Sequence, residues 1–303
     1  MQYHSSLSDA GDLEFGSNYF YGEPHIIRLR GGGLREPTYI LCRIFNPWHH
    51  LRKNRMSSCA FFADNIALTL MSEDTEDYMI IALGGSIVVP NGGINSAYLA
   101  KFKEFILSFL QEGRRFVVVM GGGAIAREYQ NVASQISSLE DEDKDWLGIH
   151  ATRLNAHLLR AIFFEVAHPV VIDNPTKEIE DLDKYSLLIA SGWRPGWSTD
   201  YIAVMLAKRF GAKKFICATS VPYVYDDDIE KNVNAKPIPQ ISWTDYRKIV
   251  GDVWTPGMRA PVDPVSARLA QEEGIEAVVV LGTDLGNLAK VIRGEKFNGS
   301  VIK

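Results

Sequence analysis

The sequence has no apolar run long enough to cross a membrane and no export signal. Its apolar stretches, such as 116–120 and 277–281, are far shorter than the ~20 residues that a transmembrane helix needs. The N-terminus has neither the basic segment nor the apolar segment that directs export. We therefore expect a cytoplasmic protein with no membrane partner.

The sequence also has few cysteines and no excess of positive charge. The chain of 303 residues has three cysteines and no CxxC pair, which argues against a disulfide framework and a zinc site. His49 and His50, taken with Cys42 or Cys59, fit no standard spacing of metal ligands, so no metal site is predicted. With 32 Lys and Arg against 37 Asp and Glu, the composition disfavours bulk electrostatic binding of nucleic acid.

Residues 1–78 lack a helical or strand period, whereas residues 79–303 are regular. Met79 is a candidate start codon, and we expect residues 1–78 to be a poorly ordered extension or a misassigned start. From the apolar strand 79–83 onward, strands alternate with helical stretches. This alternation predicts an α/β domain over residues 79–303.

Two glycine turns follow predicted strands. Gly84-Gly85-Ser86 comes directly after strand 79–83, where it forms either a simple turn or a backbone cradle for a phosphate. Gly121-Gly122-Gly123 lies between a buried strand, 114–120, and the helical stretch 124–133. A glycine turn that feeds a helix N-terminus favours anion binding, and Arg127 is placed to add a bidentate charge.

The second turn also matches the loose dinucleotide fingerprint GxGxxA, which keeps a nicotinamide-dependent dehydrogenase among the alternatives. The match is poor in context, because an earlier strand and glycine loop precede it. The acidic residue that the fingerprint requires would fall in a charged loop, 140–143, and not at the end of a strand. The GxxxxGK[ST] motif of P-loop enzymes is absent from the sequence.

Two further segments carry candidate ligand contacts. Asp145 stands at the start of a predicted helix, where it caps the helix or accepts hydrogen bonds from sugar hydroxyls. The Gly-, Pro- and Trp-rich segment 191–200 follows strand 186–190, at the strand end where open α/β sheets bind ligands. Ser198, Thr199 and Asp200 are expected to begin the helix that runs to Phe210 and to cap it.

Together these motifs resemble the amino acid kinase superfamily, and within it the uridylate (UMP) kinases of the archaeal-like type. The resemblance is collinear over residues 79–303. It rests on the two glycine turns with Arg127, on Asp145-x-x-Gly148-Ile149-x-x-Thr152-Arg153-x-Asn155-Ala156, on Gly192-x-x-Pro195-Gly196-x-x-Thr199-Asp200, on Thr219 to Asp228, on Val262-Asp263-Pro264 and on Phe297-Asn298-Gly299-Ser300.

The resemblance implies a three-layer αβα sandwich with a mostly parallel central sheet and a homohexameric assembly. It implies transfer of the γ-phosphoryl group of Mg-ATP to UMP, which gives UDP for pyrimidine nucleotide biosynthesis. UMP is expected in the half built from about residues 79–211, and ATP in the half from about 212–303. ATP and Mg2+ are the expected cofactors, and UMP is the expected small-molecule partner.

The resemblance also implies roles for individual residues. Arg127, Asp263 and Ser86 are the expected catalytic residues, and Asp263 matches an aspartate that organises the transferred phosphoryl group. The ATP site is expected to comprise Gly84, Gly85, Ser86, Gly123, Arg127, Thr219, Ser220, Tyr225 and Asp228. The UMP site is expected to comprise Gly122, Asp145, Gly192, Trp193, Arg194, Pro195, Gly196, Trp197, Ser198 and Thr199.

The residues themselves support a nucleotide acceptor. UMP brings a phosphate dianion and a ribose diol, which require an arginine, helix N–H groups and a nearby carboxylate. Arg127, the second glycine turn and Asp145 supply this set.

The sequence departs from the family pattern at three places. Ala82 precedes the first glycine turn where many members carry lysine, Ala124 follows the second where archaeal-type relatives often carry lysine, and Pro222 replaces an acidic turn residue on the ATP side. These departures leave two alternatives open. One is a kinase of the same fold for another small acceptor, and the other is a catalytically weak nucleotide-binding or storage protein.

Overall fold

The computed structural model describes residues 78–229, 231–253 and 260–303, and all of them belong to one compact unit, Ser72–Lys303. The expectation for residues 1–78 therefore falls outside the described residues, apart from Tyr78. Tyr78 is buried and packs against the ring of Phe210. Within the described ranges, no helix has the length and apolar character needed to span a membrane.

The centre of the fold is a seven-stranded sheet in the order β3-β2-β1-β4-β8-β9-β7. The first five of these strands run parallel, and β9 is antiparallel to β8. A separate antiparallel pair is formed by β5 and β6. The strands are β1 (Met79–Leu83), β2 (Phe116–Met120), β3 (Leu187–Ala190), β4 (Lys214–Thr219), β5 (Val224–Tyr225), β6 (Pro237–Ile238), β7 (Gln240–Ile241), β8 (Glu276–Leu281) and β9 (Ser300–Ile302).

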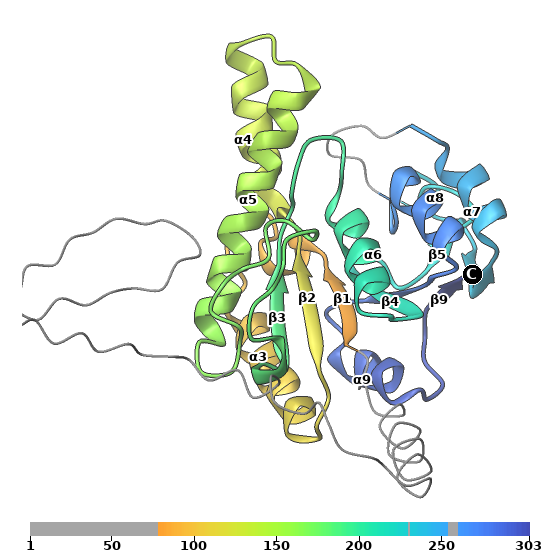
Figure 1. The fold of residues 1–303 in the computed structure, drawn as a ribbon. Helices are drawn as coiled ribbons and strands as arrows, with labels where there is room; N and C mark the ends of the chain where they lie inside the picture. Colours follow the sequence, from red (N-terminus) through yellow and green to blue (C-terminus); the bar gives the residue numbers. More distant parts are fainter. Residues whose placement is uncertain (1–77, 230, 254–259) are drawn as a thin grey trace, which may run out of the picture. The chain divides into compact units, whose positions relative to one another are not determined.

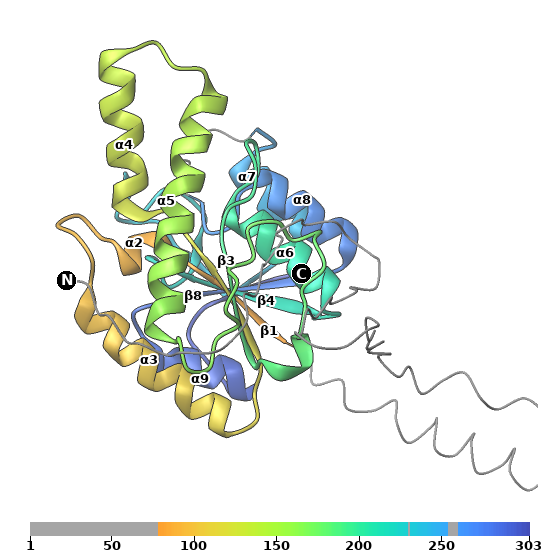
Figure 2. The same ribbon diagram turned by 60° about the vertical axis from the view of Figure 1, so that its left-hand side comes forward.

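Helices cover both faces of the sheet, which makes three layers (Figures 1 and 2). One core cluster joins α2, α3, α5 and α9 to one face, and the other joins α6, α7 and α8 to the opposite face. The helices are α2 (Gly85–Val88), α3 (Ser96–Gln111), α4 (Gly123–Ile136), α5 (Asp141–Ile162), α6 (Thr199–Arg209), α7 (Trp243–Val250), α8 (Pro264–Glu273) and α9 (Leu285–Arg293), with a short 3-10 helix η1 at Leu182–Lys184. The expected αβα sandwich with a mostly parallel sheet is thus confirmed.

The apolar runs of the sequence become the inner strands because both of their faces are covered. All five residues of β2 are buried, as are four of the five in β1. Continuous apolar runs of this kind are typical of parallel strands with helices on both sides. Burial of these side chains from both faces supplies the main driving force for the layered arrangement.

Chain order places a topological switch point beside β1. The chain builds β1, β2 and β3 outward in one direction and then returns to place β4 on the other side of β1. In open α/β sheets, ligands bind beyond the carboxyl ends of the strands at such a point. The carboxyl ends of β1 and β2 lead into the two glycine turns. The end of β3 leads into residues 191–198, which we call the 191–198 loop, and the end of β4 leads into Ser220 and the residues after it.

Two expectations about α5 were wrong. This helix begins at Asp141, so the acidic residues 140–143 form its cap position and first turn and are not a loop. Three acidic side chains in a first turn interact favourably with the positive end of the helix dipole, which explains the earlier start. Asp145 consequently lies inside the helix and does not cap it.

Candidate functional site

The two glycine turns meet backbone to backbone at the end of β1 and β2. A Cβ atom on Gly85 would lie 2.1 Å from the amide nitrogen of Gly123 and 2.5 Å from the carbonyl carbon of Gly121. Gly123 has a φ of +71°, a left-handed conformation that glycine adopts without strain. The turns are therefore one structural unit, because a side chain on either would push them apart.

A buried side-chain amide on α5 holds the second glycine turn by hydrogen bonds. The Nδ2 of Asn155 donates to the carbonyl oxygens of Gly121 and Gly122, at 2.9 Å and 3.0 Å. Asn155 is 4% exposed, so these bonds are shielded from water. With its carbonyls held by Asn155, the second turn has a fixed orientation at the start of α4.

Arg127 lies one turn into α4 and links the two glycine turns. Its Nη1 donates to the hydroxyl of Ser86 at 3.5 Å, so the guanidinium reaches the first turn from the second. Arg127 also lines both of the cavities described next. A charge at this place acts on anions on either side of it.

The first cavity, the narrow pocket, has a volume of about 160 Å3. It lies between α4, α5 and the 191–198 loop. Its walls combine glycine backbone, one arginine, one carboxylate and an indole ring. The lining residues are Gly122, Gly123, Ala126, Arg127, Gln130, Asp145, Gly148, Ile149, Thr152, Gly192, Trp197, Ser198 and Thr199.

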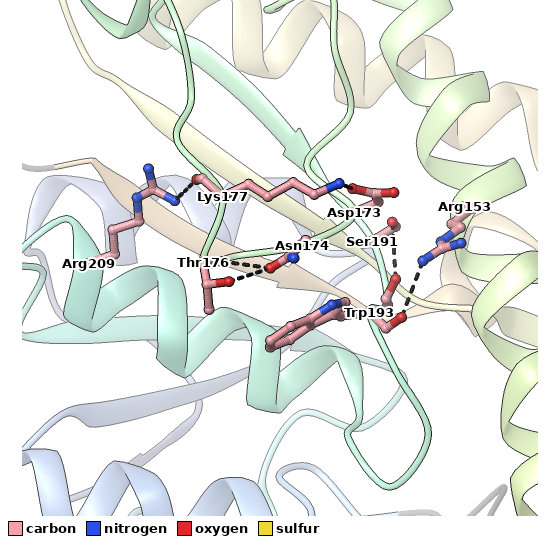
Figure 3. Close-up of polar contacts among 9 residues, drawn as sticks. Arg153, Asp173, Asn174, Thr176, Lys177, Ser191, Trp193 and Arg209 are labelled. Atoms are coloured by element: carbon pink, nitrogen blue, oxygen red, sulfur yellow. Dashed lines mark hydrogen bonds and ion pairs between the residues drawn. The ribbon is translucent and has the colours of Figure 1, made fainter. Parts of the chain in front are cut away.

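Side chains of α5 hold the 191–198 loop over the narrow pocket at three points. The Oγ1 of Thr152 accepts the N–H of Gly192 at 2.8 Å, and the Oδ2 of Asp145 accepts the N–H of Gly196 at 2.7 Å. Between them, Arg153 donates to the carbonyl oxygen of Trp193 at 3.2 Å. Figure 3 shows Arg153 reaching this carbonyl from α5, while the indole of Trp193 extends away from it toward Asn174 and Thr176. Asp145 is thus a wall of the pocket and a support of its loop.

The loop also carries a stack of aromatic and cationic groups. The guanidinium carbon of Arg194 lies 3.7 Å from the ring centroid of Trp197 and 4.7 Å from that of Trp193. The ring of Tyr201 lies 4.5 Å from Trp197 on a tilted plane. Cation–π and aromatic contacts of this kind restrict the Trp197 rotamer at the mouth of the narrow pocket.

The second cavity, the wide cavity, has a volume of about 600 Å3. It is lined largely by apolar and aromatic side chains, with several polar groups from the segment after β4. The lining residues are Ser86, Pro90, Asn91, Arg127, Thr219, Ser220, Val221, Tyr223, Val224, Tyr225, Asp227, Asp228, Ile229, Tyr246, Ile249, Val250, Ala260 and Pro261. Thr219, Ser220, Tyr225 and Asp228, which the sequence places in one site, are brought together here.

Asp263 lies apart from the walls of both cavities. Its carboxylate caps α8 by accepting the N–H groups of Val265 and Ser266, and it is 3% exposed. The neighbouring residue Asp200, in the first turn of α6, is half-buried. Burial, followed by the negative charge of Asp263, raises the pKa of Asp200 well above its usual value.

No group of three or more His, Cys, Asp or Glu side chains within the described residues is arranged to hold a metal ion.

Comparison with known proteins places the chain in a family. Residues 77–281 match the model of the amino acid kinase family. The chain belongs to the amino acid kinase family. This is the membership that the glycine turns and the segments after them predict.

Members of this family with an assigned activity are similar over most of the chain. The uridylate kinase of Hyperthermus butylicus is 33% identical over 228 residues, which cover 74% of this chain and 97% of that protein. The uridylate kinase of Pyrococcus abyssi is 33% identical over 226 residues, 74% of this chain and 99% of that protein. The crystal structure of uridylate kinase from Archaeoglobus fulgidus matches with a TM-score of 0.63 and 32% identity, covering 75% of this chain and all of that one.

The sequence did not identify the residues that hold the 191–198 loop and the second glycine turn in place. Thr152 and Asn155 belong to a recognised motif, but their roles as holders of the 191–198 loop and the second glycine turn became visible only in the fold. Polar residues on the otherwise apolar face of α5 are the signal that could have identified them. Tyr246 and Ile249 of α7 line the wide cavity without any signal in the sequence.

Proposed function

We propose that this protein is a UMP kinase that transfers the γ-phosphoryl group of ATP to UMP. The observation that carries the proposal is the position of Arg127, which lines both the narrow pocket and the wide cavity and reaches Ser86. A phosphoryl group that passes from one nucleotide to another must cross such a point. The similarity of the chain to uridylate kinases over about three quarters of its length supports the same reaction.

The narrow pocket suits UMP. Its phosphate would lie at the second glycine turn, where Gly122, Gly123 and the positive end of the α4 dipole meet Arg127. The ribose diol would donate to Asp145, which has a second carboxylate oxygen beside the one that holds Gly196. The base would then lie toward Trp197 at the far end of the 191–198 loop.

The wide cavity suits ATP and its Mg2+. Apolar and aromatic walls accept a nucleobase, and Thr219, Ser220, Tyr225 and Asp228 offer polar contacts to the base and ribose. The phosphates would extend to Gly84, Gly85 and Ser86. Bound Mg2+ would neutralise charge on the phosphate chain, and the protein residues would keep the two nucleotides aligned for in-line transfer.

Catalysis in this arrangement depends on positioning and on Arg127, with Ser86 beside it. Ala82 and Ala124 contribute no charge at the two glycine turns. We therefore propose that Arg127 stabilises the charge that develops on the transferred group. Asp263, whose carboxylate caps α8, is assigned a different role below. The homohexamer and the cytoplasmic location are part of the same proposal.

The test is an assay of ADP release from Mg-ATP by the full chain, with UMP, CMP, dUMP or no acceptor. UMP-dependent release that exceeds the other three reactions is expected. Equal release with and without UMP would exclude the proposed acceptor.

A nucleotide-binding protein without turnover is a second candidate, favoured by Ala82, Ala124 and Pro222. Calorimetric binding of UMP and of ATP, together with no ADP release, would establish it.

A further inference from the structure

A single hydroxyl connects the last residue of the 191–198 loop to the opposite half of the molecule. The Oγ of Ser198 accepts the N–H groups of Asp200 and Tyr201, at 3.1 Å and 3.2 Å, and so caps α6. The same hydroxyl donates its proton to the Oδ2 of Asp263. Since Ser198 lines the narrow pocket, the position of one pocket wall depends on this carboxylate.

Asp263 is rigidly held on its own side. Its Oδ1 accepts the N–H groups of Val265 at 2.9 Å and Ser266 at 3.1 Å, and its Oδ2 also accepts the hydroxyl of Ser266. A buried carboxylate with this many charge-assisted bonds has little freedom to move independently of α8.

The chain just before Asp263 belongs to the wall of the wide cavity. Ala260 and Pro261 line that cavity, and so does Tyr246. The hydroxyl of Tyr246 donates to the carbonyl of Val262 at 2.7 Å and accepts its N–H at 2.9 Å. Pro261 lies in the wall of the wide cavity, and only Val262 separates it from Asp263. Asp263 in turn accepts a hydrogen bond from Ser198, which lies in the wall of the narrow pocket.

We propose that Asp263 is a positioning residue that couples the two cavities through Ser198. A nucleotide in the wide cavity contacts Ala260, Pro261 and Tyr246, which fixes Val262 and Asp263 and, through them, Ser198. The 191–198 loop is then held in place for the nucleotide in the narrow pocket. Each nucleotide consequently increases the affinity for the other, and by linkage the factor is the same in both directions. This inference rests on the proposed function, because it requires a nucleotide in each cavity.

The test is isothermal titration calorimetry on the full chain. UMP is titrated with and without a saturating non-hydrolysable ATP analogue, and the analogue with and without UMP. The ratio of the two UMP dissociation constants is the coupling factor, and we expect it to exceed about fivefold, the lower end of common allosteric couplings. In Ser198→Ala, this ratio should fall to near one. A uniform loss of UMP affinity cannot produce that result, because it cancels in the ratio.

Ser266→Ala is the matched control. Its hydroxyl donates to the same carboxylate oxygen as that of Ser198 and lies 3.2 Å from the Ser198 hydroxyl, but its removal leaves the bond from Ser198 to Asp263 in place. The coupling factor should survive in this variant and in Ser198→Thr, which keeps the hydroxyl. If Ser198→Ala does not fold, the coupling factor of the unaltered chain still tests the inference, because independent binding of the two nucleotides overturns it.

Two results overturn the inference while leaving the proposed function intact. One is independent binding of UMP and the analogue by the unaltered chain, and the other is full coupling in Ser198→Ala. If the analogue binds and UMP does not, the proposed function itself fails and the inference fails with it.

Discussion

The two cavities are built in opposite ways. The narrow pocket is enclosed by glycine backbone and by a loop that α5 holds with side-chain hydrogen bonds from Thr152, Arg153 and Asp145. The wide cavity is surrounded by side chains from a short hairpin strand, connecting segments and α7. The narrow pocket therefore has little tolerance for change, whereas the wide cavity can lose an individual side chain and keep its shape. We expect the narrow pocket to determine substrate selectivity. The wide cavity mainly requires an aromatic and apolar lining.

The largest effect is expected where the glycine turns touch. Gly85→Ala would place a Cβ atom 2.1 Å from the backbone of Gly123 and so force the turns apart. We expect kcat/KM to fall by ~100-fold or more and unfolding free energy by about 1–3 kcal/mol. Steady-state kinetics measures kcat/KM, and chemical denaturation measures the free energy of unfolding. Gly286→Ala in α9 is the control, since a Cβ there has its nearest neighbour at 3.5 Å and should be neutral or stabilising. Similar losses in both variants would contradict the proposed contact.

Arg127→Met removes the charge that both cavities share. Loss of one or two charge-assisted hydrogen bonds to phosphate should lower kcat/KM by about 100-fold for UMP and for ATP alike. Arg127→Lys should recover part of this loss, because it keeps the charge without the bidentate geometry. A defect confined to one substrate would show that Arg127 serves a single cavity.

Asp145→Asn should affect one cavity only. The amide weakens the bond to the N–H of Gly196 and the acceptance of ribose hydroxyls, so KM for UMP should rise by about tenfold. KM for ATP should stay unchanged, because Asp145 does not line the wide cavity. Asp143→Asn, an exposed change in the first turn of the same helix, is the matched control. Equal effects on both KM values would remove the distinction between the cavities.

Stability should depend on pH through Asp200. Burial and the charge of Asp263 raise the pKa of Asp200 in the folded state, so the folded protein binds this proton more tightly than the unfolded chain. Protonated Asp200 therefore contributes its full stabilisation below about pH 3.9, the pKa of an aspartate in the unfolded chain. This stabilisation is lost as the pH rises through the pKa of Asp200 in the folded protein. Asp200→Asn removes this dependence. The difference in Tm between the variant and the unaltered protein should therefore grow in favour of the variant as the pH rises above about 4. A constant difference would show that Asp200 is ionised throughout.

The smallest effect is expected in the wide cavity. Ile249 lines it but is 43% exposed, so Ile249→Ala should raise KM for ATP only about two- to threefold and leave KM for UMP unchanged. Kinetics with each substrate varied in turn would measure both values. A change of tenfold or more would show that the wide cavity is as sensitive as the narrow one.

Local patterns predicted the parallel strands and the residues at their ends, because strand runs and glycine turns are encoded in short segments. The strand 79–83, the helix after Gly123 and the cap at Ser198 all occur as expected. The start of α5 was missed because charge density was interpreted as a loop. The partners of Asp145, Thr152 and Asp263 could not be predicted, since each contact joins residues more than 35 positions apart in the chain.

The contact between Gly85 and the second glycine turn also bears on how this protein can change over evolution. Neither turn can acquire a side chain at the contact while the other stays in place, so a single substitution there has no accommodating neighbour. New acceptor specificities would have to arise through the 191–198 loop, where Trp197 and Ser198 line the narrow pocket. A library that varies Trp197 and Arg194, which packs on the Trp197 ring, is therefore the productive route to altered substrates, with both glycine turns left untouched.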